Sequence, residues 1–231
     1  MSHTVVITGA NRGIGLEFTR QFADEGWRVY AGCRQPEQAT ELNRLAADNA
    51  HVTVHPLDVT KPAQIQALKA VLGDSPVDLL LNNAGSYGPD GVRFGNTDPD
   101  AWLENMRTNV IGPMKMMEAL VDNVATSRLR LIASLSSKMG SMADNGSGGA
   151  YIYRSGKAAL NAVMKSASID LAPKGIIAVV LHPGWVRTAM GGPNAEIDAE
   201  TSARRMREIL ARLTPRDAGS FFDIDGSIIP W

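Results

Sequence analysis

Short apolar runs recur along this chain, and longer segments with helical spacing separate them. The runs are rich in valine, isoleucine and leucine and span residues 3–8, 27–33, 51–57, 77–83, 128–135 and 176–183. Segments such as 14–26 and 61–73 lie between them and have the period of an α-helix. Nearly continuous apolar strands alternating with amphipathic helices are typical of βαβ units, in which helices cover both faces of a parallel sheet. No linker-like stretch divides the chain, so we expect one doubly wound α/β (Rossmann) domain over residues 1–231.

Composition and charge exclude several classes of partner. The formal net charge of -1 leaves no basic footprint for nucleic acid or an anionic membrane. The lone cysteine, Cys33, excludes an internal disulfide and is typical of a reducing compartment. The opening MSHTVVITGANRG is unlike a signal peptide or a membrane span, so we expect a cytoplasmic protein. His55 and His182 have no second ligand spaced beside them, and we expect no metal site.

The first apolar run leads directly into a glycine-rich turn that precedes a helix. Glycines at this point let the backbone turn tightly and approach a pyrophosphate at the helix N-terminus. The spacing is G-x-x-x-G-x-G rather than the general G-x-G-x-x-G, and such a turn can also bind nothing. The strand–turn–helix context favours a dinucleotide. The residues that we assign to its binding here are Gly9, Asn11, Arg12, Gly13, Ile14 and Gly15.

The end of the second strand indicates which dinucleotide binds. An acidic residue there would accept the ribose 2′-hydroxyl, whereas arginine favours a 2′-phosphate. The chain reads AGCRQPEQ, so no carboxylate ends the strand and Arg34 follows it; Arg12 can supply a second cation from the turn. Both arginines could instead be simply solvated. With the acidic alternative missing, we expect NADP(H) in preference to NAD(H).

Tyr153 and Lys157 stand one helical turn apart, which indicates a proton-transfer site. A free phenol has a pKa near 10, and both the Lys157 ammonium and an oxidised nicotinamide favour the phenolate. Lowering that pKa to about 7 requires roughly 4 kcal/mol. Ser136 and Ser137 end the fifth apolar run, and ligands in doubly wound folds sit at the carboxyl ends of strands. We expect Tyr153 to exchange the proton, Ser137 to hold the substrate oxygen and Lys157 to anchor the nicotinamide ribose.

Taken together, these motifs resemble those of the short-chain dehydrogenase/reductase family from end to end. The matching residues are Thr8, Gly9, Gly13, Gly15, Asp58, Val59, Asn82, Asn83, Ala84, Gly85, Asn109, Ser136, Ser137, Tyr153, Lys157, Pro183 and Gly184. The resemblance implies a seven-stranded parallel sheet, with a dinucleotide-binding part at about 1–125 and a catalytic and substrate-loop part at about 126–231. Segments such as CRQPEQATEL and DIDGSIIPW are similar to the C-factor and sniffer-like carbonyl reductase branch, whose members favour NADPH.

The resemblance also implies roles that spacing does not supply. Asn109 would lie on a central helix and hold a water that links Lys157 to solvent. Of the remaining cofactor residues, Asp58 and Val59 would lie beside the adenine, Asn83, Ala84 and Gly85 on the adenine-ribose side, and Pro183, Gly184, Val186 and Thr188 beside the nicotinamide. Most relatives are homodimers or homotetramers built through two long helices, here about 99–124 and 150–172.

Two features depart from the common pattern of the family. Ser137 lies sixteen residues before Tyr153, a longer interval than in many members, and the extra residues fall in MADNGSGG. Ser136 is the rival for the catalytic role, but Gly140 matches Ser137 in the family's S-S-x-x-G run. Gly156 stands directly before Lys157, although glycine inside a helix costs about 1 kcal/mol against alanine. Either the helix approaches the cofactor closely there, or the position is tolerant and has drifted.

Apolar residues in the expected rim loops predict the substrate pocket. They are Tyr87, Met139, Met142, Trp185 and Met190. Together they predict an adaptable site for a small apolar carbonyl or alcohol. Segment 184–200 has the composition of a mobile flap, with an ordinary connecting loop as the alternative. Tyr151 has no lysine four residues later and either lines the cleft or packs.

The sequence therefore predicts an oxidoreductase that transfers a hydride between NADP(H) and a carbonyl or alcohol. A second hypothesis is a dinucleotide-binding regulatory protein of the C-factor type, in which catalysis is weak or dispensable. A dehydratase or epimerase on this fold usually needs a larger substrate region than the chain has after residue 190.

Overall fold

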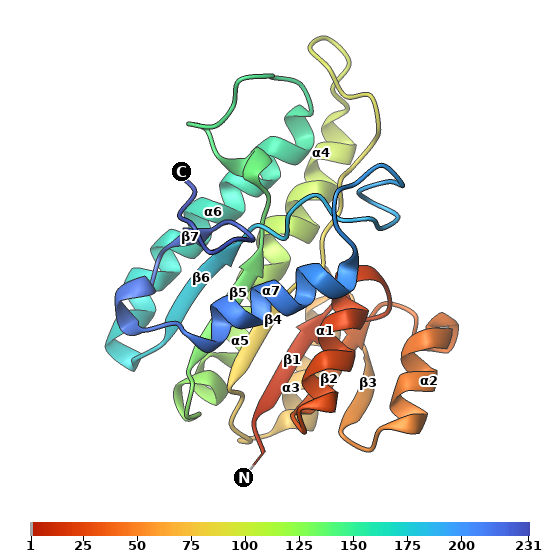
Figure 1. Cartoon of the computed structure of the whole chain (residues 1–231), viewed down its shortest axis with the longest axis vertical. Coiled ribbons are helices and arrows are strands. Elements are labelled where there is room, and N and C mark those ends of the chain that lie inside the picture. Colours follow the sequence, from red (N-terminus) through yellow and green to blue (C-terminus); the bar gives the residue numbers. More distant parts are fainter. Residues whose placement is uncertain (1) are drawn as a thin grey trace.

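Seven parallel strands form a single central sheet in the computed structural model, which describes residues 2–231 (Figure 1). The strands are β1 (Thr4–Thr8), β2 (Arg28–Cys33), β3 (Val52–Pro56), β4 (Leu79–Asn82), β5 (Leu131–Leu135), β6 (Ile177–Leu181) and β7 (Phe221–Phe222). Their order is β3-β2-β1-β4-β5-β6-β7, and each neighbouring pair is parallel. The predicted doubly wound fold is confirmed. The order reverses between β1 and β4, which is where such folds bind ligands.

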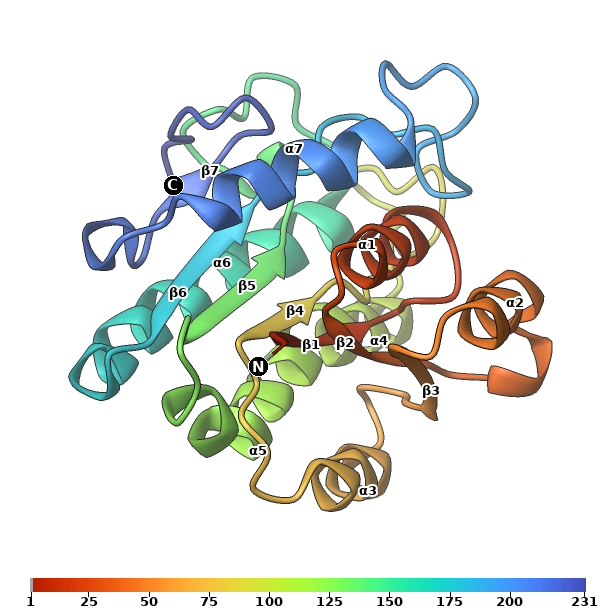
Figure 2. The same cartoon turned by 60° about the horizontal axis from the view of Figure 1, so that its bottom comes forward.

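Helices cover both faces of the sheet (Figure 2). They are α1 (Gly13–Asp24), α2 (Thr40–Asp48), α3 (Pro62–Leu72), α4 (Pro99–Met106), α5 (Gly112–Ala125), α6 (Tyr151–Leu171) and α7 (Ala199–Ala211). One face packs against α1, α2 and α7, and the other against α3, α5 and α6. Among residues 2–231, no helix has both the length and the apolarity needed to cross a bilayer.

Strand β1 shows why the apolar runs are nearly continuous. Val5 and Ile7 belong to the core under α1 and α7, whereas Val6 belongs to the core on the opposite face. All three side chains are fully buried. Because successive side chains point to opposite faces, a strand covered on both sides must be apolar at every position.

The long helix expected at about 99–124 is interrupted by a π-helical turn, Arg107–Ile111, between α4 and α5. Pro113 lacks an N–H group and therefore cannot donate to the Asn109 carbonyl one turn earlier. The preceding N–H, that of Gly112, donates instead to Arg107 O, five residues back. This local widening lies where Asn109 enters the site, and π-turns are frequent at functional sites.

Candidate active site

A hydrogen-bonded clamp joins the carboxyl ends of β1 and β4. The backbone N–H groups of Asn83 and Ala84 donate to Thr8 Oγ1 at 3.0 and 2.9 Å. The Asn83 amide donates to Thr8 O at 2.8 Å and to Gly9 O at 3.0 Å. The side chain that was expected beside the adenine ribose thus supports the glycine turn.

The glycine turn has the backbone shape that a pyrophosphate needs. Gly9 and Gly13 adopt φ values of 67° and 53°, which L side chains rarely adopt. A Cβ on Gly15 would lie 2.2 Å from Gly9 O, so only glycine lets the helix approach the turn. No side chain caps the N-terminus of α1, so its first N–H groups stay free to bind an anion. These residues fit a dinucleotide; Asn11 is half-buried in the turn, and Ile14 packs against the core.

Two arginines flank the turn without ion-pair partners. Arg12 is the N-cap residue of α1, and Arg34 directly follows β2. Both are exposed, and neither forms a salt bridge with any residue of the described range 2–231. Their guanidinium groups therefore stay available for a phosphate.

Asp58 and Val59 follow the carboxyl end of β3, at the same edge of the sheet as the glycine turn. The Asp58 carboxylate accepts hydrogen bonds from Thr60 N at 2.9 Å and Thr60 Oγ1 at 2.7 Å. Val59 is 7% exposed, and a Cβ on Gly112 would lie 2.7 Å from its Cγ2. Val59 therefore fixes the start of α5 against the end of β3.

Ser137 and Tyr153 meet where β5 ends. Ser137 Oγ accepts from Met139 N at 3.2 Å and lies close enough to Tyr153 to lower the pKa of its phenol. The rival Ser136 instead turns its hydroxyl to Lys157 O, at 3.4 Å. A Cβ on Gly140 would lie 2.8 Å from the Lys157 backbone carbon, so this glycine lets the segment after β5 lie close to α6. The geometry favours Ser137 over Ser136.

The Tyr153 phenol is held in its neutral form. Burial raises its pKa to about 12, while the hydrogen bond with Ser137 lowers that pKa and the nearby Tyr87 raises it. The expected lowering of this pKa by Lys157 is absent in the chain alone, where burial dominates. Lys157 Nζ lies 5.8 Å from the Tyr153 ring centre and donates to Leu135 O at 2.8 Å. A neutral phenol is the form that can give a proton to a carbonyl oxygen.

Lys157 is a buried cation beside the end of β4. It is 5% exposed, and burial lowers its pKa to about 8. Most molecules therefore keep this ammonium charged at pH 7. A Cβ on Gly85 would lie 3.5 Å from Lys157 Nζ and 3.2 Å from Asn109 Oδ1. The three predicted residues are thus brought together, with glycine needed where they meet.

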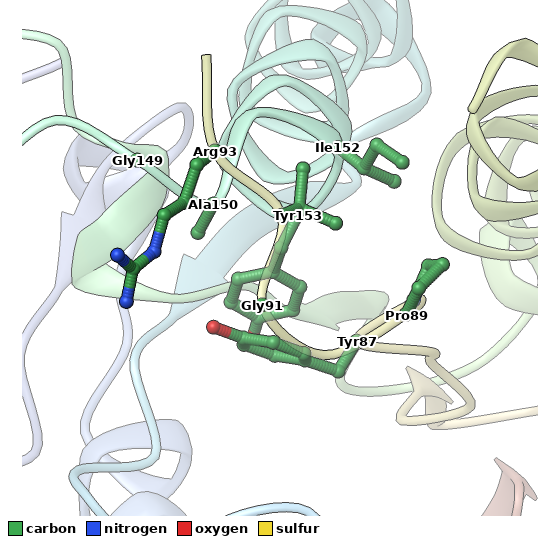
Figure 3. Close-up of a pocket in the computed structure, with 9 residues that line it drawn as sticks. Tyr87, Pro89, Gly91, Arg93, Gly149, Ala150, Ile152 and Tyr153 are labelled. Atoms are coloured by element: carbon green, nitrogen blue, oxygen red, sulfur yellow. The ribbon is translucent and has the colours of Figure 1, made fainter. Parts of the chain in front are cut away.

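The loop after β4 and the start of α6 enclose a pocket beside Tyr153 (Figure 3). The Tyr87 ring lies across the Tyr153 ring, with centres 4.6 Å apart and planes tilted by 33°. Tyr151 is absent from the pocket lining; it is 37% exposed, and its ring centre lies 6.4 Å from that of Phe94. Tyr151 therefore lies outside this pocket, as an exposed residue next to the exposed Phe94.

The remaining predicted pocket residues lie apart from Tyr87. Met139 is half-buried, and its carbonyl accepts from Arg154. Met142 lines a separate hollow together with Trp231. Trp185 and Met190 are about half exposed in segment 184–200, where Trp185 Nε1 donates to Gly191 O at 2.8 Å.

Segment 184–200 folds back on itself and reaches the glycine turn. Val186 pairs with Ile197 in an isolated β-bridge, and Gly184 (φ 80°) turns the chain where a Cβ would meet the Ile197 side chain at 2.9 Å. Thr188 Cγ2 lies 3.2 Å from a Cβ built on Gly13. Pro183, which precedes this segment, accepts from Ser202 in α7 through its carbonyl. These contacts bring Thr188, which is expected beside the nicotinamide, close to Gly13 in the turn that is expected to bind the pyrophosphate.

Sequence comparison agrees with this arrangement. The family profile described as short chain dehydrogenase matches residues 3–198. The chain belongs to the short-chain dehydrogenase family.

Three similar proteins indicate the branch of the family to which this short-chain dehydrogenase belongs. C-signal of Myxococcus xanthus is 43% identical over 156 residues, which cover 68% of this chain and 93% of that protein. The NADPH-bound carbonyl reductase from chicken fatty liver has a TM-score of 0.94 and 33% identity, over 100% of this chain and 99% of that one. The carbonyl reductase Sniffer of D. melanogaster has a TM-score of 0.92 and 31% identity, over 100% of both chains. The chain is an oxidoreductase of the C-factor and sniffer-like branch.

Asn105 is the site residue of this short-chain dehydrogenase that sequence reasoning missed. It is 1% exposed, donates to Ser86 O at 2.9 Å, and accepts from Asn109 Nδ2 at 3.0 Å. Asn109 in turn binds both the N–H and the carbonyl of Ser86, at 2.8 and 2.7 Å. Asn105 and Asn109 are four residues apart on one helix face, and that spacing was the available signal.

The same asparagine explains the unusual glycine of α6. A Cβ on Gly156 would lie 2.2 Å from Asn105 Oδ1. The sequence left two explanations open, close approach to the cofactor and drift at a tolerant position. The structure instead shows close approach to Asn105.

Proposed function

We propose that this oxidoreductase is an NADPH-dependent carbonyl reductase in which Tyr153 donates the proton. One observation carries the proposal: the buried phenol of Tyr153 lies beside Ser137 and the buried Lys157, at the sheet edge that also holds the glycine turn. In the opposite direction, the same residues would oxidise an alcohol. NADPH, when bound, would supply the hydride.

The proposed cofactor site extends across the rim of the sheet. The residues that would hold NADPH are Gly9, Asn11, Arg12, Gly13, Ile14, Gly15, Arg34, Asp58, Val59, Asn83, Ala84, Gly85, Tyr153, Lys157, Pro183, Gly184, Val186 and Thr188. The unpaired guanidinium groups of Arg12 and Arg34 support a preference for NADP(H) over NAD(H), because they can bind the 2′-phosphate. In this assignment, residues 1–125 bind the dinucleotide and residues 126–231 contribute catalysis and the substrate loop.

Proton transfer follows from the environments of the side chains. Ser137 would donate a hydrogen bond to the carbonyl oxygen and hold it near the phenol. Tyr153 then passes its phenolic proton to that oxygen as negative charge develops on it. The phenolate left behind is stabilised by the Lys157 ammonium. Asn109 would hold the water that reconnects Lys157 to solvent.

The proposed substrate is a small carbonyl or alcohol compound with apolar parts. The tyrosine-lined pocket supports this, and two similar proteins of known structure are described as carbonyl reductases. Met139, Met142, Trp185 and Met190 would contact the substrate in a rearranged or closed state of their loops. We further propose a cytoplasmic homodimer or homotetramer.

The test is an NADPH oxidation assay with a panel of aldehydes, ketones and quinones. The proposal predicts turnover of at least one class, with NADPH used at a higher kcat/KM than NADH. A complete lack of turnover across the panel, by a protein that binds NADPH, would count against a reductase.

The similarity to C-signal supports a second candidate, a regulatory protein that binds dinucleotide and reports to a partner. Ser137→Ala separates the two functions, because Ser137 would contact the substrate rather than the dinucleotide. As an enzyme, the variant should bind NADPH normally, lose turnover and fail to restore any cellular role. Full restoration of that role without turnover would favour the regulatory protein.

A further inference from the structure

Arg93 is the one charged residue among those that line the pocket beside Tyr153. The pocket has a volume of about 220 Å³. Its uncharged lining residues are Tyr87, Pro89, Gly91, Val92, Gly149, Ala150, Ile152 and Tyr153. Figure 3 shows the Arg93 guanidinium on the side of the pocket toward which the Tyr87 hydroxyl is directed. The pocket therefore has a reactive end at Tyr153 and a cationic end at Arg93.

Hydrogen bonds fix the backbone that carries Arg93. Asn96 Oδ1 accepts from Arg93 N at 2.6 Å, and Asn96 Nδ2 donates to Gly91 O at 3.1 Å. Ala150 N, at the start of α6, donates to Val92 O at 3.1 Å. Ala150 makes this contact from a left-handed backbone conformation, φ 45°, which is uncommon for alanine. Arg93 is thus tied to the helix that carries Tyr153.

The Arg93 side chain has no partner of its own within residues 2–231. It forms no salt bridge there, and no hydrogen bond engages its guanidinium. Arg154, by contrast, donates hydrogen bonds to Gly148 O, Met139 O and Ser147 Oγ. Arg154 is therefore a structural residue, whereas Arg93 keeps its planar fork of N–H donors free. That fork matches the two oxygens of a carboxylate.

We propose that Arg93 is a specificity-determining residue that binds a carboxylate carried by the substrate at the end remote from its carbonyl group. The inference rests on the proposed reductase function, because the carbonyl must reach Tyr153 while the carboxylate reaches Arg93. The Tyr87 hydroxyl lies on the correct side to add a hydrogen bond. Val92 and Ile152 would contact the apolar chain between the two groups. The substrate class is therefore an oxo acid with separated carbonyl and carboxylate groups.

The test compares ω-oxo carboxylates of increasing length with their methyl esters, which keep the carbonyl and lose the charge. The wild-type chain should show a higher kcat/KM for the acid at the length that spans the pocket. Arg93→Gln should lower kcat/KM for that acid about five- to twentyfold, mainly through KM, and change the ester less than twofold. The difference should shrink at high salt. Arg128→Gln is the matched control, because Arg93 and Arg128 are both exposed but Arg128 precedes β5, at the opposite end of the sheet.

Calorimetric titration of NADPH-saturated protein with a saturated carboxylate and the corresponding amide gives a readout without turnover. Carboxylate binding that is stronger than amide binding and is lost in Arg93→Gln supports the inference, even if no carbonyl compound is turned over and the reductase proposal fails. Equal binding of acid and amide, or an equal effect of Arg93→Gln on acid and ester turnover, would overturn it. That second outcome would leave the reductase proposal intact.

Discussion

Replacing Gly156 with alanine tests whether α6 needs a glycine where it faces Asn105. The added Cβ would lie 2.2 Å from Asn105 Oδ1, far inside the 3.4 Å at which ordinary contact begins. Asn105 has little freedom to move away, because it is buried and its amide is bonded to Ser86 and Asn109. The substitution must therefore displace either α6 or the asparagine.

Opposing effects determine how far Gly156→Ala changes the free energy of unfolding. Alanine in a helix interior gains about 1 kcal/mol over glycine. Overpacking a buried contact costs about 1–3 kcal/mol, and leaving buried amide groups without partners costs about another 1–3 kcal/mol. We expect the free energy of unfolding to fall by about 1–5 kcal/mol, and each kcal/mol lowers Tm by roughly 2–4 °C in a chain of this size.

Urea and thermal denaturation measure this change, and Gly146→Ala provides the control. A Cβ on Gly146 meets nothing within 4 Å, so that variant should stay within about 0.5 kcal/mol of the wild type. Asn105→Ala combined with Gly156→Ala should be more stable than the sum of the single effects, because the clashing group is gone. If Gly156→Ala instead gained the full helix-propensity benefit, the steric explanation would be refuted.

Further predictions concern the cofactor and the buried cation. Arg34→Asp should weaken NADPH binding at least tenfold more than NADH binding, by loss of a phosphate contact; fluorescence titration checks this, and equal losses would contradict it. Lys157→Met should abolish turnover yet raise the free energy of unfolding at pH 7 by about 1–3 kcal/mol, because burial lowers the Lys157 pKa from 10.5 to about 8. Between pH 8 and 10.5 the folded wild type binds fewer protons than its unfolded chain. The free energy by which Lys157→Met is more stable than the wild type should therefore shrink as pH rises through that window. Denaturation of both proteins from pH 7 to 10 measures the difference, and a constant gap would argue against a shifted lysine.

The fold was largely predictable because the strong signals are local. Apolar runs such as 77–83 and 176–183 contain β4 and β6. Strand β7 has only two residues, too few to form a recognisable run. The π-turn before Gly112 was also missed, because helical periodicity does not reveal a single widened turn.

In the candidate site, too, local features could be predicted from the sequence and contacts between distant segments could not. Tyr153 and Lys157 could be paired from their spacing, since residues four apart share a helix face. The spacing predicted that Lys157 lowers the Tyr153 pKa, whereas burial raises it; spacing does not reveal how deeply the fold buries the phenol. Contacts between distant segments, such as Asn105 with Gly156, have no local signature.

The most direct test of proton donation by Tyr153 compares Tyr153→Phe with Tyr151→Phe. Both lose one phenolic hydroxyl from the start of α6, but Tyr151 lies outside the pocket. With a carbonyl substrate that the wild type reduces, Tyr153→Phe should lower kcat by about 10²–10⁴ with NADPH affinity unchanged, whereas Tyr151→Phe should stay near the wild type. Full activity of Tyr153→Phe would contradict the central claim.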